Sequence, residues 1–550
     1  MMVALLRVAA ASLAIVLMLT TSAQAVSEAR ADTPAGRVLG LASEGVQVFK
    51  GVPYARAPVG DLRWKPPLPL PTWKGEFDAR QFGAACPQLR SRPAGNIYAD
   101  TLPSIDEDCL SLNIWKPKKA RNAPVFVWIH GGALVAGASS LSMYDGSTLA
   151  REEGLVVVSI NYRLGVLGYL AHPELSAESP DGVSGNYGLL DQIAALEWIK
   201  RNIAAFGGNP DNVTIAGESA GALSVLYLMT APPARGLFSK AIAQSAYMIN
   251  TPELKERRHG EHAAEAVGVW LTGQLGADGI AALRKMDAEE LVAAAANAGY
   301  APWGVVDGAV LPRQIVDVFD RGEQAPVPLI AGFNSGEIRS LRFLLPPAPD
   351  DAATYEATIR AAYRELADDF LALYPADDIE ESMLAASRDG LYGWTSERMA
   401  AKQAAIGVPS FLYLFDHGYP AANEAGLHAF HAAEIPYVFG TMLTTARAWP
   451  RAPDTVMERR LSTAMRKYWA SFARDGAPTA ASEPDWAPYA DEKAYMKFDG
   501  APHPEKDLYP GMYVLHEEVT CRRRAAGDTP WNWNVGVIAP VLPPPAPGCR

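Results

Sequence analysis

Short apolar runs alternate with helical patterns through the middle of the chain. Continuous apolar runs at residues 124–129 and 155–160 predict buried strands. Apolar residues recur at helical spacing over residues 189–206, which predicts a helix with one buried face. Strands that alternate with helices predict an α/β fold, in which helices flank a large, mostly parallel central sheet. Further strands are expected at residues 212–216, 240–244, 328–333 and 410–415, and a further helix at 222–229.

The pattern changes outside this alternating region. Residues 345–405 have mostly helical spacing and are expected to form a cap or side layer beside the sheet. Residues 26–35 are expected to be a short polar lead-in, and residues 522–524, all arginine, a solvated charge run. No internal repeat or long linker divides the chain. We therefore expect one α/β domain over residues 26–520 and a proline-rich C-terminal tail over residues 521–550, which is extended from Val541.

The N-terminal residues have the order of a secretory signal peptide. Arg7 precedes an apolar run at residues 8–19, and an Ala-x-Ala sequence ends at Ala25. We expect cleavage after Ala25 and a secreted or periplasmic protein without a stable membrane anchor. An uncleaved anchor is the alternative, but the run is shorter than the ~20 residues that span a bilayer.

Composition narrows the function classes. Of the 550 residues, 49% are hydrophobic and 20% are charged, which is typical of a globular protein. The net charge of −12 argues against nucleic-acid binding, which requires a basic face. The oligomeric state is left open.

A G-x-S-x-G motif at residues 217–221 places Ser219 between the predicted strand 212–216 and the predicted helix 222–229. In this context the motif predicts a nucleophile elbow, a strained turn that exposes the serine hydroxyl at the edge of the sheet. A neutral serine requires a base within hydrogen-bond reach. The alternative is an ordinary turn with a buried serine.

A glycine-rich turn follows the predicted strand 124–129. Backbone N–H groups in such a turn stabilise the negative charge that develops on a carbonyl oxygen during acyl transfer, together with the N–H after the nucleophile. The alternative is a plain glycine turn. The candidate oxyanion-hole residues are Gly131, Gly132, Ala133 and Ala220.

Longer segments resemble the type-B carboxylesterase family, the cholinesterase-like branch of the α/β-hydrolases. Residues 206–221 reproduce the serine signature of that family, and residues 107–114 resemble its second signature. Residues 49–55 and 431–440 also match, so the likeness runs from about residue 34 to residue 515. The resemblance implies an α/β-hydrolase fold, a bacterial-type carboxylesterase activity on small-molecule esters, and no cofactor.

Three features depart from the family pattern. Ala133 and Ala432 stand where the family usually has glycine, and an alanine restricts the backbone. No tryptophan lies between Cys86 and Cys109, where cholinesterases place their choline-binding residue. A cation–π site for a quaternary ammonium group is therefore not supported in that loop.

The order of the catalytic triad in this fold is serine, acid, histidine. Glu337 follows the predicted strand 328–333 and matches the acid segment of the family, so we expect it to orient the catalytic histidine. His431 has the family spacing H-x-x-E-[IL] and is preferred to His428 as the base. A metal site at His428, His431 and Glu434 is disfavoured, because an H-E-x-x-H motif is absent.

The resemblance also suggests supporting features. It implies a disulfide between Cys86 and Cys109, and Cys521 is expected to pair with Cys549, with two free thiols as the alternative. Ser245 is expected to support the triad by hydrogen bonding. Glu218 either biases the electric field at the serine or is an exposed turn residue. Three aromatic residues are candidates for the lining of the substrate pocket, with core packing as the alternative: Trp303, Phe343 and Trp394.

These features predict a secreted serine carboxylesterase that forms an acyl-enzyme on Ser219. One alternative is a non-catalytic binding protein on the same fold, since fold does not determine function. Another alternative is a specialised hydrolase of a toxin, carbamate or polymer ester, with the same chemistry and a different pocket.

Overall fold

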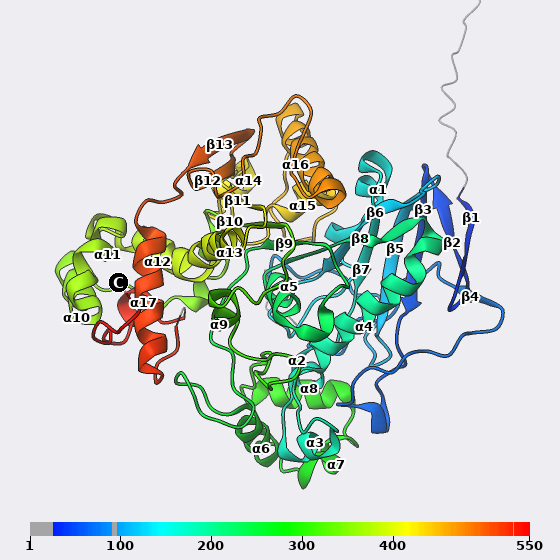
Figure 1. Cartoon of the computed structure of the whole chain (residues 1–550), viewed down its shortest axis with the longest axis horizontal. Coiled ribbons are helices and arrows are strands. Elements are labelled where there is room, and N and C mark those ends of the chain that lie inside the picture. Colours follow the sequence, from blue (N-terminus) through cyan, green and yellow to red (C-terminus); the bar gives the residue numbers. More distant parts are fainter. Residues whose placement is uncertain (1–25, 91–95, 532, 550) are drawn as a thin grey trace, which may run out of the picture.

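A single sheet of 13 strands runs through the protein, seen in a computed structural model that describes residues 26–90, 96–531 and 533–549 (Figure 1). The expected signal peptide, residues 1–25, lies outside the described residues. The strand order is β1-β2-β3-β5-β7-β6-β8-β9-β10-β11-β12-β13, and β4 pairs with β2. The strand bounds are β1 Ser27–Thr33, β2 Gly36–Ser43, β3 Val46–Pro53, β4 Glu76–Asp78, β5 Ser111–Pro117, β6 Ala123–Ile129, β7 Val156–Ile160, β8 Gly208–Glu218, β9 Lys240–Gln244, β10 Leu329–Asn334, β11 Ser410–Phe415, β12 Ala494–Phe498 and β13 Pro502–Lys506.

The central strands are parallel, as the alternation predicts. Every neighbouring pair from β7 through β6, β8, β9, β10 and β11 to β12 is parallel, whereas β1, β2, β3, β5 and β13 pair antiparallel. The central strands are buried almost throughout, because helices cover both faces. This confirms the predicted α/β-hydrolase architecture.

The expectation of a polar lead-in at residues 26–35 is wrong. Ser27–Thr33 of this segment form β1, which pairs along its whole length with β2. Ala29 and Ala31 are buried, whereas their neighbours Arg30 and Asp32 face outward. Two small apolar residues in alternation give a weak strand signal, because alanine favours strands little.

Two large apolar clusters lie on the two faces of the sheet. Helices α4, α5 and α13 pack on one face, and α1, α15 and α16 pack on the other (Figure 1). None of the helices in the described part of the chain combines the length and the apolar character needed to cross a membrane. The helix bounds are α1 Ser147–Glu153, α2 Gly165–Tyr169, α3 Pro173–Glu178, α4 Tyr187–Asn202, α5 Ala220–Thr230, α6 Ala264–Gln274, α7 Gly279–Leu283, α8 Ala288–Asn297, α9 Ile315–Asp320, α10 Ala352–Tyr363, α11 Ala367–Leu373, α12 Ile379–Arg388, α13 Trp394–Ala405, α14 Pro420–Glu424, α15 Ile435–Phe439, α16 Val456–Asp475 and α17 Met512–Ala526.

Helices α10, α11 and α12, which lie within the expected range 345–405, form a layer beside the sheet together with α17, with an apolar cluster of their own (Figure 1). Helix α13 also lies within that range but packs on the sheet against β10 and β11. A π-helical turn, Asp389–Gly393, joins α12 to α13. Both expected disulfides are present, Cys86 with Cys109 and Cys521 with Cys549.

Helix α17 continues through Cys521 and ends at Ala526. The expectation of a solvated charge run at residues 522–524 is wrong for two of its three arginines. Arg522 and Arg523 are buried, and Arg522 pairs with Glu518 on the same helix and with Glu365. A buried charge requires a partner of opposite charge, and the fold supplies Glu518 and Glu365 to Arg522.

Candidate active site

Ser219 occupies the junction between β8 and α5. Its backbone has φ 57° and ψ −124°, a strained conformation for a residue with a side chain. The turn is also tight, because a Cβ placed on Gly221 would lie 2.1 Å from the carbonyl oxygen of Ile129. The side chain of Ser219 is only half-buried. The predicted turn therefore has the geometry of a nucleophile elbow.

The glycine-rich turn after β6 lies against Ser219. A Cβ placed on Gly131 would lie 3.2 Å from the Cβ of Ser219, so glycine permits this approach. The carbonyl of Gly132 accepts hydrogen bonds from the N–H groups of Val135 and Ala136, at 3.1 and 3.0 Å, which fixes the turn. Ala133 adopts φ 56°, a left-handed conformation that normally favours glycine.

The N–H of Ala220 adds a donor on the opposite side of the serine. Ala220 is the first residue of α5, and the first N–H groups of a helix lack an acceptor within the helix. The partial positive charge at the start of α5 also favours an anion there. Of the four residues predicted for the oxyanion hole, Gly131 therefore packs against Ser219 and Ala220 follows it directly in the chain, whereas Gly132 and Ala133 belong to the turn after β6.

Glu337 is fully buried just after β10. Its Oε1 accepts hydrogen bonds from the hydroxyl of Ser245, at 2.6 Å, and from the backbone N–H of Asn334, at 2.8 Å. Its Oε2 accepts a hydrogen bond from Nδ1 of His431. The acid is thus fixed on both oxygens, and one of the contacts comes from Ser245, the residue expected to support it.

His431 lies in the turn before α15. The hydroxyl of Tyr98 donates to its backbone carbonyl at 3.0 Å, and the ring of Tyr392 lies 5.4 Å from the imidazole, centroid to centroid. With Nδ1 bound to Glu337, Nε2 is the nitrogen available to the reaction. No hydrogen bond joins it to Ser219 Oγ among the described residues. Such contacts often tighten only when substrate binds.

Glu218 is buried, contrary to the expectation of an exposed turn residue. Its Oε1 lies 3.0 Å from Nε2 of His431, without the alignment of a hydrogen bond, so the attraction is Coulombic. Burial, together with the nearby carboxylates, raises the pKa of Glu218 to about 8, although His431 opposes the rise. The alternative in which Glu218 biases the electric field at the site is the one that agrees with this geometry.

The pKa of His431 reflects two opposing effects. Burial lowers it, but the carboxylates Glu218 and Glu337 outweigh burial and raise the pKa to about 9, with a smaller effect from Glu434. The imidazolium is therefore unusually favoured at this site. A histidine that must act as a base is then expected to be most effective in alkaline solution.

A third buried carboxylate, Glu434, lies near Glu337. Glu434 accepts hydrogen bonds from Gln244, at 2.8 Å, and from Asn334, at 2.6 Å. Trp469 donates to Gln244 at 3.0 Å, and the carbonyl of Gln244 accepts the N–H of Ser219 at 3.0 Å. Burial raises the pKa of Glu434. This network links the segments that carry the serine, the acid and the histidine, so it holds them in register.

The aromatic candidates separate into three environments. Trp394 is fully buried and donates to Glu517 at 2.7 Å, which makes it a core residue. Phe343 is 80% exposed, so it is not a core residue. Trp303 is half-buried in an aromatic group that the sequence analysis did not identify. Tyr98 and Tyr392 beside His431 were also missed, because they come from a loop and a π-helical turn with no recognisable motif.

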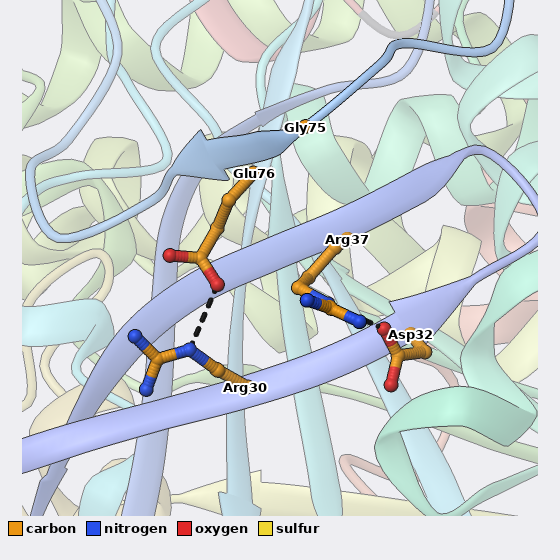
Figure 2. A pocket seen from close by; sticks show the side chains of 5 residues that line it. All are labelled: Arg30, Asp32, Arg37, Gly75 and Glu76. Atoms are coloured by element: carbon orange, nitrogen blue, oxygen red, sulfur yellow. Dashed lines mark hydrogen bonds and ion pairs between the residues drawn. The ribbon is translucent and has the colours of Figure 1, made fainter.

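Two surface hollows are lined by none of the three triad side chains. An open hollow of ≈ 670 Å³ lies over β1, β2 and β4, where Arg30 pairs with Glu76 and Arg37 pairs with Asp32 (Figure 2). His428 is exposed and lines a different cavity, of ≈ 270 Å³. Within the described ranges, no group of three or more His, Cys, Asp or Glu residues is arranged to hold a metal ion.

The comparisons with known proteins decide the family. The sequence profile of the carboxylesterase family matches residues 27–511. The chain belongs to the carboxylesterase family. Fumonisin B1 esterase of Sphingopyxis macrogoltabida is 37% identical over 487 residues, which cover 85% of each chain. Para-nitrobenzyl esterase of Bacillus subtilis is 36% identical, over 84% of this chain and 92% of the relative.

Solved structures of the family agree with the fold. A structure of PNB esterase superposes with a TM-score of 0.75 and 31% identity, over 88% of this chain and 99% of that one. The protein is therefore a carboxylic ester hydrolase of the α/β-hydrolase fold, and carboxylesterases of this family act on small-molecule esters.

Proposed function

We propose that the protein is an exported serine carboxylesterase with Ser219 as nucleophile, His431 as general base and acid, and Glu337 as the orienting acid. The observation that carries the proposal is the buried contact between Glu337 and Nδ1 of His431, beside a strained and half-exposed Ser219. This contact fixes the tautomer that leaves Nε2 free to accept a proton.

In the acylation step, Nε2 of His431 takes the proton of Ser219 while Oγ attacks the ester carbonyl carbon. The carbonyl oxygen gains a negative charge, which the N–H groups of Gly132, Ala133 and Ala220 stabilise, with Gly131 shaping the turn. The C–O bond to the alcohol then breaks. His431 returns the proton to the leaving alcohol, and the acyl group remains on Ser219.

In the deacylation step, a water molecule gives its proton to His431 and attacks the acyl carbon. The same N–H groups stabilise the second oxyanion, and the bond to Ser219 breaks. The proton returns from His431 to Oγ, and the carboxylic acid leaves. Throughout, Glu337 stabilises the imidazolium without taking its proton. These steps use only protein groups and water.

Two features support export. The N-terminal residues have the order of a cleavable signal peptide with Ala25 at its end. The chain also carries two disulfides, and disulfides persist mainly in oxidising compartments. We infer a secreted or periplasmic enzyme, with a catalytic domain over residues 26–520 and a C-terminal tail over residues 521–550.

The second candidate function is a hydrolase that is specialised for one class of ester. A relative that is 37% identical carries the name fumonisin B1 esterase, which supports the alternative of a specialised hydrolase with a narrow ester substrate. The same triad would serve such a substrate, because a change of ester alters the pocket and leaves the chemistry unchanged.

The test is hydrolysis of a series of p-nitrophenyl esters by the purified mature protein, by Ser219→Ala and by His431→Ala. We expect turnover by the wild type and a loss of about 10³-fold or more in kcat in each variant. Equal activity of wild type and Ser219→Ala would refute the assigned nucleophile. Absence of activity in a folded wild type across simple and toxin-type esters would favour the binding-protein alternative.

A further inference from the structure

A chain of aromatic rings leads from the proposed catalytic histidine to the C-terminal tail. The ring of Tyr392 lies 5.4 Å from that of His431, and Tyr247 meets Tyr392 edge-on at 6.1 Å. Trp533 meets Tyr247 edge-on at 6.1 Å, and Trp303 lies 6.1 Å from Trp533. The rings come from four separate parts of the chain and form one continuous aromatic wall, defined here as Tyr392, Tyr247, Trp533 and Trp303.

The rings at the two ends of the aromatic wall differ in solvent exposure. Tyr392 and Tyr247 are buried, whereas Trp533 and Trp303 are only half-buried, so their indole rings retain accessible apolar surface. Neither tyrosine hydroxyl forms a hydrogen bond within the described residues. Half-exposed aromatic surface, here joined to His431 through two buried tyrosine rings, is typical of small-molecule sites.

The inner half of the wall is tied to the nucleophile. Tyr247 follows β9 by three residues, and the last residue of β9, Gln244, accepts the N–H of Ser219 at 3.0 Å. Tyr392 lies in the π-helical turn Asp389–Gly393, a rare element that occurs often at functional sites. Both tyrosines are therefore held at fixed positions relative to the reacting groups.

The outer part of the wall includes Trp533, which belongs to the C-terminal tail. The match to the family model ends at residue 511, before this tail begins. Trp531 is buried and donates to the carbonyl of Met248, next to Tyr247, at 2.8 Å. Arg523 donates to the carbonyl of Asn534 at 2.8 Å. These bonds hold the residues on both sides of Trp533.

The tail is also fixed further along. The N–H of Gly536 donates to the hydroxyl of Tyr363 at 2.8 Å, and the N–H of Leu542 donates to the carbonyl of Ala362 at 2.7 Å. The disulfide between Cys521 and Cys549 closes this segment onto α17. The tail is thus held against the rest of the fold by hydrogen bonds at Trp531, Asn534, Gly536 and Leu542.

We propose that Trp533, together with Trp303, is a specificity-determining residue that binds a bulky apolar or aromatic group of the ester substrate. This inference rests on the proposed function at Ser219 and adds the part of the pocket that selects the substrate. A flat indole pair offers dispersion contact and excludes water, so it favours a large apolar group over a small one. The group belongs either to the acyl part or to the alcohol part of the ester.

The experiment compares Trp533→Ala with wild type on two ester series. The acyl series is p-nitrophenyl acetate, butyrate, octanoate and benzoate, and the alcohol series is the acetates of ethanol, hexanol and benzyl alcohol, followed by acid release. In one of the series, kcat/KM for the bulkiest members is expected to fall about tenfold relative to the smallest member, mainly through KM. The series that responds identifies which part of the ester meets Trp533.

Trp270→Ala is the matched control, because Trp270 lies on α6 and is 42% exposed, away from the wall. It is expected to leave both profiles unchanged. Trp533→Phe keeps an aromatic ring and is expected to give an intermediate profile, and it replaces Trp533→Ala if that variant does not fold.

Two results would overturn the inference. One is an unchanged ratio of bulky to small substrates in both series, and the other is a uniform loss across all substrates in a folded variant. Either would mean that Trp533 has no selective contact with substrate. Failure of the proposed function has a different signature, because the wild type itself would then hydrolyse no ester or would do so independently of Ser219.

Discussion

Replacement of Glu218 by glutamine is expected to shift the pH dependence of activity toward acid. His431 must be neutral to accept the proton of Ser219, and its pKa of about 9 leaves only about 10% neutral at pH 8. Glu218, 3.0 Å from Nε2, is one of the two carboxylates that raise this pKa most, the other being Glu337. Glutamine keeps the shape and removes the charge, so the imidazolium loses stabilisation and its pKa falls.

The size of the shift follows from the remaining charges. Glu337 and Glu434 still raise the pKa of His431, so we expect a decrease of about one unit, worth about 1.4 kcal/mol. A pKa of roughly 8 would leave about half of His431 neutral at pH 8, which is a gain of about fivefold in kcat/KM at that pH if acylation is otherwise unchanged.

The assay is kcat/KM for one p-nitrophenyl ester between pH 6 and pH 10, with enzyme-free blanks at every pH. Glu256→Gln is the matched control, because Glu256 is exposed and the net charge changes equally. An acid limb that stays in place, or moves toward alkali, in Glu218→Gln would refute the reasoning. It would mean that Glu218 does not stabilise the imidazolium of His431.

Three further predictions concern supporting residues. Ser245→Ala removes the 2.6 Å hydrogen bond to Glu337 and is expected to lower kcat about tenfold, with normal circular dichroism; unchanged kcat would contradict this role. Ala432→Gly is expected to raise the free energy of unfolding by about 0.5 kcal/mol, because Ala432 has φ 68°; a lower Tm would show that no strain is relieved. Desolvation raises the pKa of buried Glu397 to about 7. Its contribution to the free energy of unfolding is therefore fully present below pH 4.5, where the side chain is neutral in both the folded and the unfolded protein, and is lost as the pH rises through about 7. Glu397→Gln is therefore expected to match wild type in denaturant unfolding at pH 5 and to be more stable by up to about 3 kcal/mol at pH 9; equal stability at both values would contradict this.

The central sheet could be predicted because its strands are buried on both faces. The predicted strands at 240–244 and 410–415 coincide with β9 and β11, since a continuous apolar run has few other ways to be buried. The edge strand β1 was missed because only alanines mark its buried side. Edge strands carry little of the core, so their sequence pattern is weaker.

Some features of the candidate site could likewise be predicted from the sequence, and others could not. The turn at Ser219 and the position of Glu337 after β10 follow from local sequence context, because strand ends position such residues. The burial of Glu218 and the aromatic wall depend on contacts between distant segments. Trp533 meets Tyr247 across nearly 300 residues of sequence, and no local pattern encodes such a contact.

Buried charge was the least predictable property. Arg522 is buried because Glu365, 157 residues away, and Glu518 both reach it. A run of three arginines is more often solvated, and only the packing of α10 and α11 beside α17 reverses that preference. The charged residues can be read from the sequence, but which of them form buried ion pairs depends on contacts between distant segments of the fold.

Trapping of the acyl-enzyme tests the central claim most directly. The wild type is mixed with a p-nitrophenyl ester, quenched in acid during turnover, digested and analysed by mass spectrometry. We expect the acyl mass on the peptide that contains Ser219, and its absence from Ser219→Ala treated in the same way. An acyl group on another residue, or turnover by Ser219→Ala at the wild-type rate, would contradict the account.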